Sequence, residues 1–162
     1  MIEPRSDDLV QLAAFRIGDE EFAIDIMRIK QIIHPQKITK VPKAPRFVEG
    51  VVELRGAILP IVDLRRRFDV PNRELTRASK YIIVSIDDRL IGLVVDAVSQ
   101  VLRVPRADIK PPPEFGPTGG PTFFTGVCQV GDRIVMILDL DQVLTRQERI
   151  ELGTSAPKAD PA

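Results

Sequence analysis

The chain carries one short pattern twice, once in each half. The first copy, Gly50–Phe68, reads GVVELRGAILPIVDLRRRF, and the second, Gly126–Leu144, reads GVCQVGDRIVMILDLDQVL. In both, two apolar runs flank a turn and end in Asp-Leu. An earlier pair, Ile17–Phe22 and Ile86–Ile91, is also similar, but its two copies lie closer together in the chain. Two similar halves built from short strands are typical of paired small barrels or of a sandwich.

The growing offset between the halves points to one long irregular loop. Three prolines stand at 111–113, and a Gly/Pro-rich stretch follows up to Pro121. This segment is the natural place for the extra length of the second half. Each half has only about 60 residues, which is too few for a strong core alone, so we expect the halves to pack together.

Hairpins and short helices complete the predicted elements. Val48–Leu54 and Ala57–Val62 flank Arg-Gly and predict a hairpin, and Tyr81–Ile86 and Leu90–Val95 predict another. We expect Asp63 to cap a helical turn over Leu64–Phe68, and Asp139 or Asp141 to cap the stretch through Leu144 to about Leu152.

Composition excludes several partner classes. Lys plus Arg and Asp plus Glu are both 23, and the chain has one Tyr and no Trp. A neutral chain without interleaved aromatics is a poor match for nucleic acid or for an anionic membrane surface. Arg65–Arg67 is interpreted as a solvated helix face. No apolar run approaches the roughly 20 residues of a membrane helix, so we expect no direct membrane insertion and a cytoplasmic protein.

Catalytic and metal-binding groups are scarce. His34 is the only histidine and follows an apolar strand, and Cys128 is the only cysteine and lies within one. One of each cannot build a zinc site or an ordinary triad. Asp139-x-Asp141 could bind a metal ion, but capping a helix is the favoured interpretation. No phosphate-binding glycine loop is present, so no cofactor is expected.

Elimination leaves a surface that binds other proteins. An enzyme on a small barrel and a nucleic-acid-binding barrel stay as disfavoured alternatives. Arg55 stands out, because hairpin turns usually favour Asn-Gly or Asp-Gly, and the second copy has Val130-Gly131-Asp132 at this place. A long cation at an exposed tip is well placed to meet a carboxylate, and arginine is enriched at interface hot spots.

Five stretches together resemble one known family. They are Phe15–Asp25, Ile38–Pro42 with Pro45, Gly50–Arg65, Ile91–Val98 and Phe124–Val127. In order and spacing they resemble the CheW family of scaffold proteins in bacterial chemotaxis. The resemblance covers roughly residues 12–150, and several ordered stretches are far more specific than one short motif.

The resemblance implies an all-β fold of two interlocked five-stranded SH3-like barrels with a few short helices. The first strand, residues 9–17, would pair with the barrel of the second half. Lobe one would then span about 18–80 and lobe two about 81–148 within a single domain, 9–152. Residues 1–8 are expected to be a flexible N-terminus and 153–162 a disordered tail.

The resemblance also implies a function. Members of that family are not enzymes; they bridge the regulatory domain of a CheA-type histidine kinase to the cytoplasmic tip of methyl-accepting chemoreceptors. The kinase domain has the same fold, so lobes can pair pseudo-symmetrically into rings. The protein would be recruited to membrane-associated or cytosolic receptor arrays. The same scaffold role in a gliding, twitching or other chemosensory pathway is the alternative.

Partner-binding residues follow one at a time from the resemblance. Ile29, Gly50 and Arg55 match family positions tied to partner binding, and Gly56 and Gln31 complete the predicted set. The family often has Glu at the Gln31 position, so we expect a Gln31–Arg55 hydrogen bond in place of a salt bridge. Gly50 would permit close approach of a partner. Arg55→Glu or Gly50→Asp is expected to leave the fold intact and to weaken partner binding.

Overall fold

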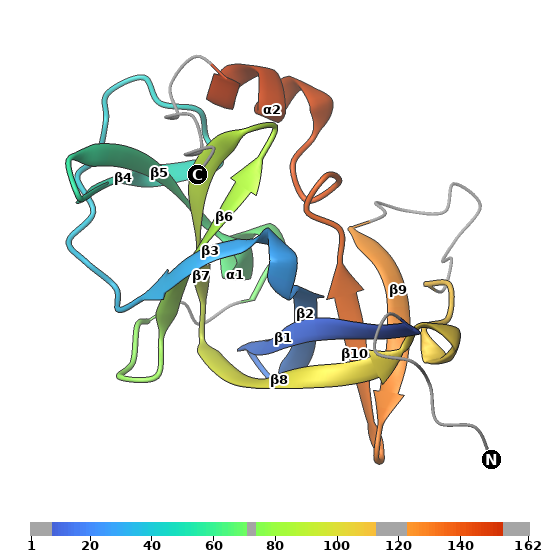
Figure 1. Cartoon of the computed structure of the whole chain (residues 1–162). Coiled ribbons are helices and arrows are strands. Elements are labelled where there is room, and N and C mark those ends of the chain that lie inside the picture. Colours follow the sequence, from blue (N-terminus) through green and yellow to red (C-terminus); the bar gives the residue numbers. More distant parts are fainter. Residues whose placement is uncertain (1–7, 71–73, 113–122, 154–162) are drawn as a thin grey trace.

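Two five-stranded sheets make up most of the protein (Figure 1). The computed structural model describes residues 8–70, 74–112 and 123–153. The predicted flexible N-terminus and tail lie almost wholly outside these ranges, as does most of the loop around 111–121. The strands are β1 Leu9–Ile17, β2 Glu20–Asp25, β3 Ile29–Ile33, β4 Val48–Leu54, β5 Ala57–Asp63, β6 Lys80–Ile86, β7 Arg89–Val95, β8 Ala97–Pro105, β9 Phe124–Val130 and β10 Arg133–Leu138. The helical turns are η2 Ile26–Arg28, α1 Leu64–Arg67, η3 Arg106–Asp108 and α2 Arg146–Gly153.

The predicted fold of two interlocked five-stranded barrels is confirmed. One sheet has the strand order β8-β1-β2-β10-β9 and is called lobe A; the other has the order β3-β6-β7-β5-β4 and is called lobe B. An isolated bridge, Lys110 to Val127, joins the segment after β8 to β9 at the opposite edge of lobe A. In lobe B a second isolated bridge, Thr39 to Val51, joins the segment that follows β3 to strand β4 at the opposite edge. Each sheet is thereby curled into a small barrel.

The sequence repeat is the structural repeat, with one hairpin exchanged between the halves. Strands β1 to β5 correspond to β6 to β10, yet hairpin β1–β2 lies in the sheet of β8–β10, and hairpin β6–β7 lies in the sheet of β3–β5. The parallel pairs show the equivalence residue by residue. Ile61 pairs with Gly92, and their equivalents in the other halves, Ile137 and Ala23, pair with each other. Neither half can complete a sheet without strands from the other.

The sheets divide the chain at other points than the predicted lobes. Strand β1 does pair with β8 of the second half, as the resemblance implies, but β2 stays with β1 in lobe A. Strands β6 and β7, expected in the second lobe, belong to lobe B with β3–β5. The whole hairpin is exchanged because its two strands are joined by a tight turn at Gly18-Asp19 and by a continuous antiparallel register from Leu12 to Ile17.

The extra length of the second half falls where the loop was expected. Ile109 is the equivalent of Ile38, because each packs against the glycine that opens the next strand, Gly126 and Gly50. The chain between Ile109 and Gly126 is longer than the chain between Ile38 and Gly50. Most of the surplus therefore lies in the segment that contains the Gly/Pro-rich stretch.

Three apolar clusters stabilise this arrangement. The first lies between the lobes and contains residues of both, including Phe15 and Ile24 from lobe A and Ile82 and Leu93 from lobe B. The second and third fill the interiors of lobes A and B. Strands β6 and β7 bury both faces along Tyr81–Val84 and Ile91–Val95, one against the barrel interior and one against the other lobe. Burial between the lobes therefore makes them one cooperative unit.

The two predicted helix starts have different outcomes. Asp63 caps α1, because its Oδ1 accepts a hydrogen bond of 2.9 Å from the Arg65 amide. The second helix begins later than expected, at Arg146. Thr145 Oγ1 accepts from the Glu148 amide at 3.1 Å and Glu148 Oε1 accepts from the Thr145 amide at 2.8 Å. This reciprocal pair is a capping box, and Asp139 instead accepts from the Asp141 amide in the turn before it.

Candidate docking surfaces

Arg55 and Gly56 form the tip between β4 and β5. Their φ angles are 52° and 83°, so both central residues of the turn have positive φ, as a type I′ turn requires. Both residues are exposed. An arginine in this conformation is strained by about 1 kcal/mol relative to the Gly or Asn that such turns favour. At the equivalent tip in lobe A, Gly131 takes the first position, with φ 63°.

Ile29 and Gln31 lie on β3, an edge strand of lobe B. Ile29 is partly buried against the cluster between the lobes, and its partner on β6 is Val84. Gln31 is half-buried beside Ile83, just after a shift in the strand register. The expected hydrogen bond between Gln31 and Arg55 is not found among the described residues, where neither side chain has a hydrogen bond or an ion pair. The structure therefore leaves Arg55 available to an external carboxylate.

Gly50 is buried and faces its own chain. A Cβ atom there would lie 2.3 Å from Ile38 Cγ2 and 2.6 Å from the Thr39 carbonyl oxygen, at a φ of +155°. The vacant side-chain position is taken by the segment that bridges to Val51, so it is not open to a partner. The prediction that Gly50→Asp leaves the fold intact is wrong for this reason. Gly126 has the same role in lobe A, with a Cβ position 2.7 Å from Ile109 Cγ2.

The prediction that Arg65 belongs to a solvated helix face is wrong, because this residue is buried. Its side chain is 3% exposed and makes a two-pronged contact with Asp63, Nε to Oδ1 at 3.0 Å and Nη2 to Oδ2 at 2.9 Å. Its Nη1 also reaches Asp96 Oδ1 at 3.2 Å, and Asp96 Oδ2 accepts from the Gly18 amide at 2.6 Å. Burial lowers the pKa of Arg65, but hydrogen bonds and charges of the two aspartates outweigh burial and raise it overall.

This network, here called the Arg65 network, fastens α1 of lobe B to the crossing from β7 to β8 and to the β1–β2 turn of lobe A. A second ion pair, which is exposed, lies at the crossing from β2 to β3. Here the arginine is on the crossing and the aspartate is on the turn that ends the repeat. Arg28 in η2, which follows β2, reaches Asp141 Oδ1 at 3.2 Å, and Asp141 occupies the position equivalent to Arg65 in the repeat. Each lobe therefore carries one ion pair between the turn that ends its repeat and the strand crossing beside it.

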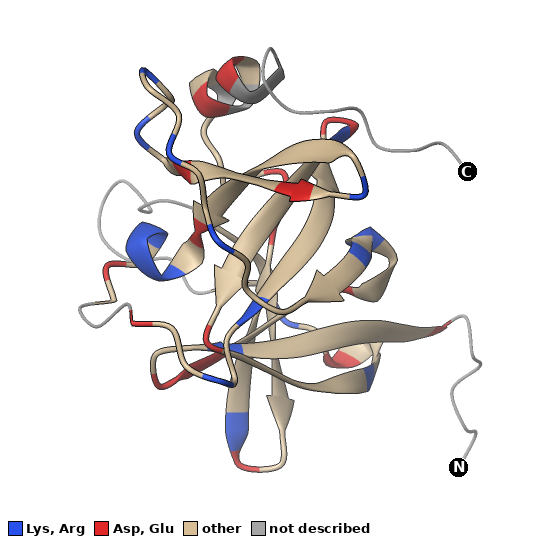
Figure 2. Cartoon of the chain, turned by 90° about the vertical axis from the view of Figure 1, so that its left-hand side faces the viewer, with Lys and Arg blue, Asp and Glu red and all other residues tan. Residues whose placement is uncertain are grey.

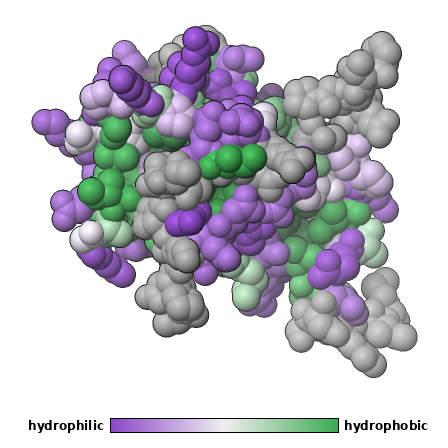
Figure 3. Space-filling view, turned by 90° about the horizontal axis from the view of Figure 1, so that it is seen from above, coloured by the Kyte–Doolittle hydropathy of each residue, from purple (hydrophilic) through white to green (hydrophobic). Residues whose placement is uncertain are grey.

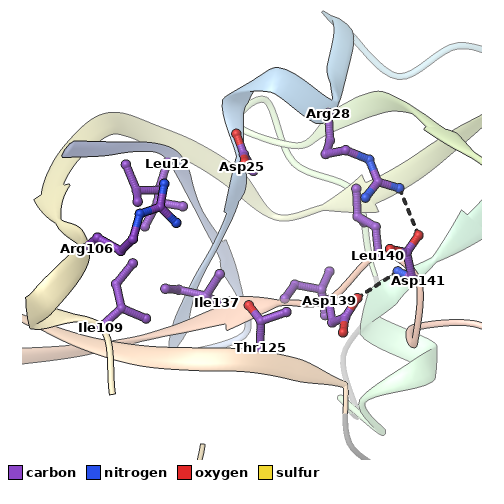
Figure 4. Close-up of a pocket in the computed structure, with 12 residues that line it drawn as sticks. Leu12, Asp25, Arg28, Arg106, Ile109, Thr125, Ile137, Asp139, Leu140 and Asp141 are labelled. Atoms are coloured by element: carbon purple, nitrogen blue, oxygen red, sulfur yellow. Dashed lines mark hydrogen bonds and ion pairs between the residues drawn. The ribbon is translucent and has the colours of Figure 1, made fainter. Parts of the chain in front are cut away.

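A cavity opens in lobe A beside that second ion pair (Figure 4). It has a volume of about 440 Å³ and an apolar floor that includes Leu12, Ile109 and Ile137. In Figure 4, Arg106 and Leu12 lie on one side of the cavity, and Arg28 and Asp141 face each other on the other side. The remaining lining residues are Val10, Asp25, Thr125, Leu138, Asp139 and Leu140.

The residues considered for chemistry are distributed as follows. His34 is exposed at the end of β3. Cys128 is buried in lobe A, and burial raises the pKa of its thiol, with a further increase from the charge of Glu21. No cluster of three or more His, Cys, Asp or Glu side chains suited to a metal ion occurs within residues 8–70, 74–112 and 123–153. Asp139 acts in the turn before α2 and does not cap that helix.

Exposed aliphatic residues occupy equivalent positions in the two lobes. Ile58 on β5 is 58% exposed, and its equivalent on β10, Ile134, is 64% exposed. Ile32 on β3 and its equivalent on β8, Val101, are exposed too. Apolar residues reach the surface in separate patches (Figure 3), and Lys/Arg and Asp/Glu are interspersed (Figure 2). Among the described residues no helix has the length and apolar character needed to cross a membrane.

Comparison with known proteins gives a consistent result. A family model described as a CheW-like domain matches residues 11–148. Chemotaxis protein CheW of Rhizobium meliloti (strain 1021) is 39% identical over 139 residues, which cover 86% of this chain and 90% of the relative. Chemotaxis protein CheW of Klebsiella aerogenes is 34% identical over 134 residues, or 83% of this chain and 81% of the relative. The crystal structure of scaffolding protein TtCheW from Thermoanaerobacter tengcongensis has a TM-score of 0.75 and 32% identity, covering 83% of this chain and 91% of that one.

Proposed function

The chain belongs to the CheW-like domain family, and from this premise we propose that it is a non-catalytic adaptor of chemotaxis signalling that couples chemoreceptors to a CheA-type histidine kinase. The observation that carries the proposal is the family match over residues 11–148, together with a relative of 39% identity along 90% of its length. The partners are the regulatory domain of the kinase and the cytoplasmic receptor tip. The adaptor works in the cytoplasm, at receptor arrays.

Two features of the surface support a role in protein association. The equivalent exposed aliphatics, Ile58 with Ile134 and Ile32 with Val101, give both lobes a similar apolar contact. A partner lobe of the same fold could contact either lobe of this protein through these apolar residues, which suits pseudo-symmetric pairing into rings. The predicted set of Ile29, Gln31, Arg55 and Gly56 lies on lobe B, and Gly50 contributes by positioning β4 against the segment after β3.

Backbone strain at Arg55 supports its assignment to partner binding. The turn would be more stable with Asn or Gly, yet it holds an exposed arginine with no partner among the described residues. Strain of this kind often accompanies function. A guanidinium presented at a rigid tip is a suitable group for a carboxylate on the kinase domain.

Substitutions at Arg55 should therefore separate binding from stability. We expect Arg55→Asn to raise the free energy of unfolding by up to about 1 kcal/mol, because Asn tolerates the left-handed conformation. Arg55→Glu should leave it nearly unchanged. Both should weaken binding to the kinase regulatory domain about tenfold or more, because both remove the cation. Urea unfolding and calorimetric titration with the domain from the same organism measure the two effects.

Arg77→Glu, an exposed charge reversal outside the tip, is the matched control and should bind as the wild type does. Undiminished binding of Arg55→Glu would remove Arg55 from the interface. If neither the wild type nor any variant binds the kinase domain or the receptor tip of its own organism, the adaptor proposal itself fails. Binding only to the kinase of a gliding or twitching system would instead select the alternative pathway.

A further inference from the structure

The cavity in lobe A has a counterpart in lobe B that the protein fills with its own tyrosine. Leu12 on β1 pairs with Leu102 and with Asp25 on the neighbouring strands. Tyr81, its equivalent on β6, pairs with Ile33 and Val94, which are the equivalents of Leu102 and Asp25 in the repeat. Leu12 and Tyr81 therefore occupy the same place in the two barrels.

The surroundings of Tyr81 correspond to the walls of the cavity. Tyr81 is fully buried in one cluster with Ile61, and Ile38 packs against that cluster. Its hydroxyl donates a hydrogen bond of 3.1 Å to the Gln36 carbonyl oxygen. Burial raises the pKa of Tyr81, and the charge of Asp63 raises it further.

In lobe A the residues at these positions line the open cavity. Ile137 and Asp139 are the equivalents of Ile61 and Asp63, and Ile109 contacts Gly126 as Ile38 contacts Gly50. Two large side chains are missing, because lobe A has Leu12 where lobe B has Tyr81 and Asp141 where lobe B has the buried Arg65. The volume of about 440 Å³ lies within the usual range of binding pockets.

We propose that the lobe A cavity binds a tyrosine side chain of a partner polypeptide, with the ring beside Leu12, the smaller counterpart of Tyr81. The ring would pack on Leu12, Ile109 and Ile137, three apolar residues of the lining. Arg106, which also lines the cavity, can contact the ring through its guanidinium. This docking site goes beyond the adaptor function, because it lies in lobe A, away from the predicted set on lobe B.

The lining also suits an aromatic ring. Its apolar residues are flanked by Arg28 and Arg106, and an aromatic ring gains from contact with both kinds of group. The carboxylates of Asp25, Asp139 and Asp141 line the cavity as well, and Arg28 pairs with Asp141, so a guanidinium is the competing occupant that the test must exclude.

The test uses p-cresol, the side chain of tyrosine as a free molecule, titrated into the full-length protein and followed by ¹H–¹⁵N correlation spectra. We expect saturable shifts confined to residues around the cavity, with a low-millimolar dissociation constant, as suits a ligand of this size. Methylguanidinium should bind at least tenfold more weakly. No saturable shift with p-cresol, or tighter binding of methylguanidinium, would overturn the proposal.

Two variants fill the cavity from different sides. Leu12→Tyr places in lobe A the residue that lobe B already accommodates, and Thr125→Trp covers the cavity from an exposed position on β9. Each should weaken p-cresol binding at least tenfold, while Arg77→Glu, an exposed substitution outside the cavity, should bind as the wild type does. Should Leu12→Tyr fail to fold, Thr125→Trp still decides. Unchanged binding in the folded variants contradicts the assignment.

A capped peptide, Gly-Gly-Tyr-Gly-Gly, distinguishes a polypeptide from a free phenol as the occupant. We expect it to shift the same resonances at least as strongly as p-cresol at equal concentration, and to lose this effect in Thr125→Trp. A site that accepts p-cresol and excludes the peptide would overturn the assignment to a partner polypeptide.

Discussion

Gly50→Ala should destabilise the protein by about 3 kcal/mol, because the new methyl group meets both an unfavourable backbone conformation and close neighbours. About 1–2 kcal/mol comes from a positive-φ backbone conformation that a side chain resists. About 1–3 kcal/mol comes from overpacking, because the new Cβ would lie 2.6 Å from the Thr39 carbonyl oxygen and 2.3 Å from Ile38 Cγ2. Urea unfolding followed by circular dichroism measures the loss, and binding to the proposed kinase partner should fall only as far as unfolding requires.

The internal repeat supplies graded controls for this substitution. Gly126→Ala meets the same crowding, at 2.7 Å and 2.9 Å, without a positive φ, so it should cost about 1–3 kcal/mol. Gly131→Ala has a φ of +63° and nothing within 4 Å, so it should cost only about 1 kcal/mol. Equal losses for Gly50→Ala and Gly131→Ala would show that packing against Thr39 is unimportant.

Much of the fold follows from the sequence because the repeat is visible in it. The Gly50 and Gly126 copies, the two hairpins and the Asp63 cap are local patterns, and local hydrogen bonds and turn preferences decide them. Their recurrence in the same order in both halves predicted two barrels, which the structure confirms.

Local sequence patterns could not predict that the two halves of the chain exchange their first hairpins. Strand β5 pairs with β7 from the second half of the chain. Strand β2, the equivalent of β7 in the same half as β5, has apolar residues at matching positions but pairs with β10 instead. What distinguishes the arrangement is the cluster between the lobes, which is a property of the whole chain. One signal was available: Tyr81–Val84 and Ile91–Val95 are apolar on both faces, so both faces must be covered.

The sequence comparison singled out one residue of the candidate surfaces and overlooked another. The repeat singled out Arg55, which the structure places at an exposed, strained tip. The same comparison could have identified Arg65, since Asp63-x-Arg65 replaces Asp139-x-Asp141, and a charge reversed between equivalent positions indicates a different environment. The run of three arginines obscured this difference, because only the fold determines which of them is buried.

Arg65→Met should destabilise the protein by about 3–5 kcal/mol, because it leaves carboxylates of a buried network without their cation. Asp63 is almost as buried as Arg65, and Asp96 also holds the Gly18 amide of lobe A. Loss of the guanidinium therefore loosens the connection between lobes as well as the end of α1. Urea unfolding measures the loss, and Arg66→Met is the matched control, because the Arg66–Glu49 pair is exposed and worth at most about 1 kcal/mol.

A second substitution separates the charge from the packing. Asp63→Asn removes the negative charge and keeps the oxygen that caps α1, so it should destabilise the wild type but recover part of the stability lost in Arg65→Met. The interaction free energy from this double-mutant cycle should reach about 1–3 kcal/mol. A cycle that closes with no interaction, or an Arg65→Met variant no weaker than Arg66→Met, would mean that the guanidinium serves only to fill space between the lobes.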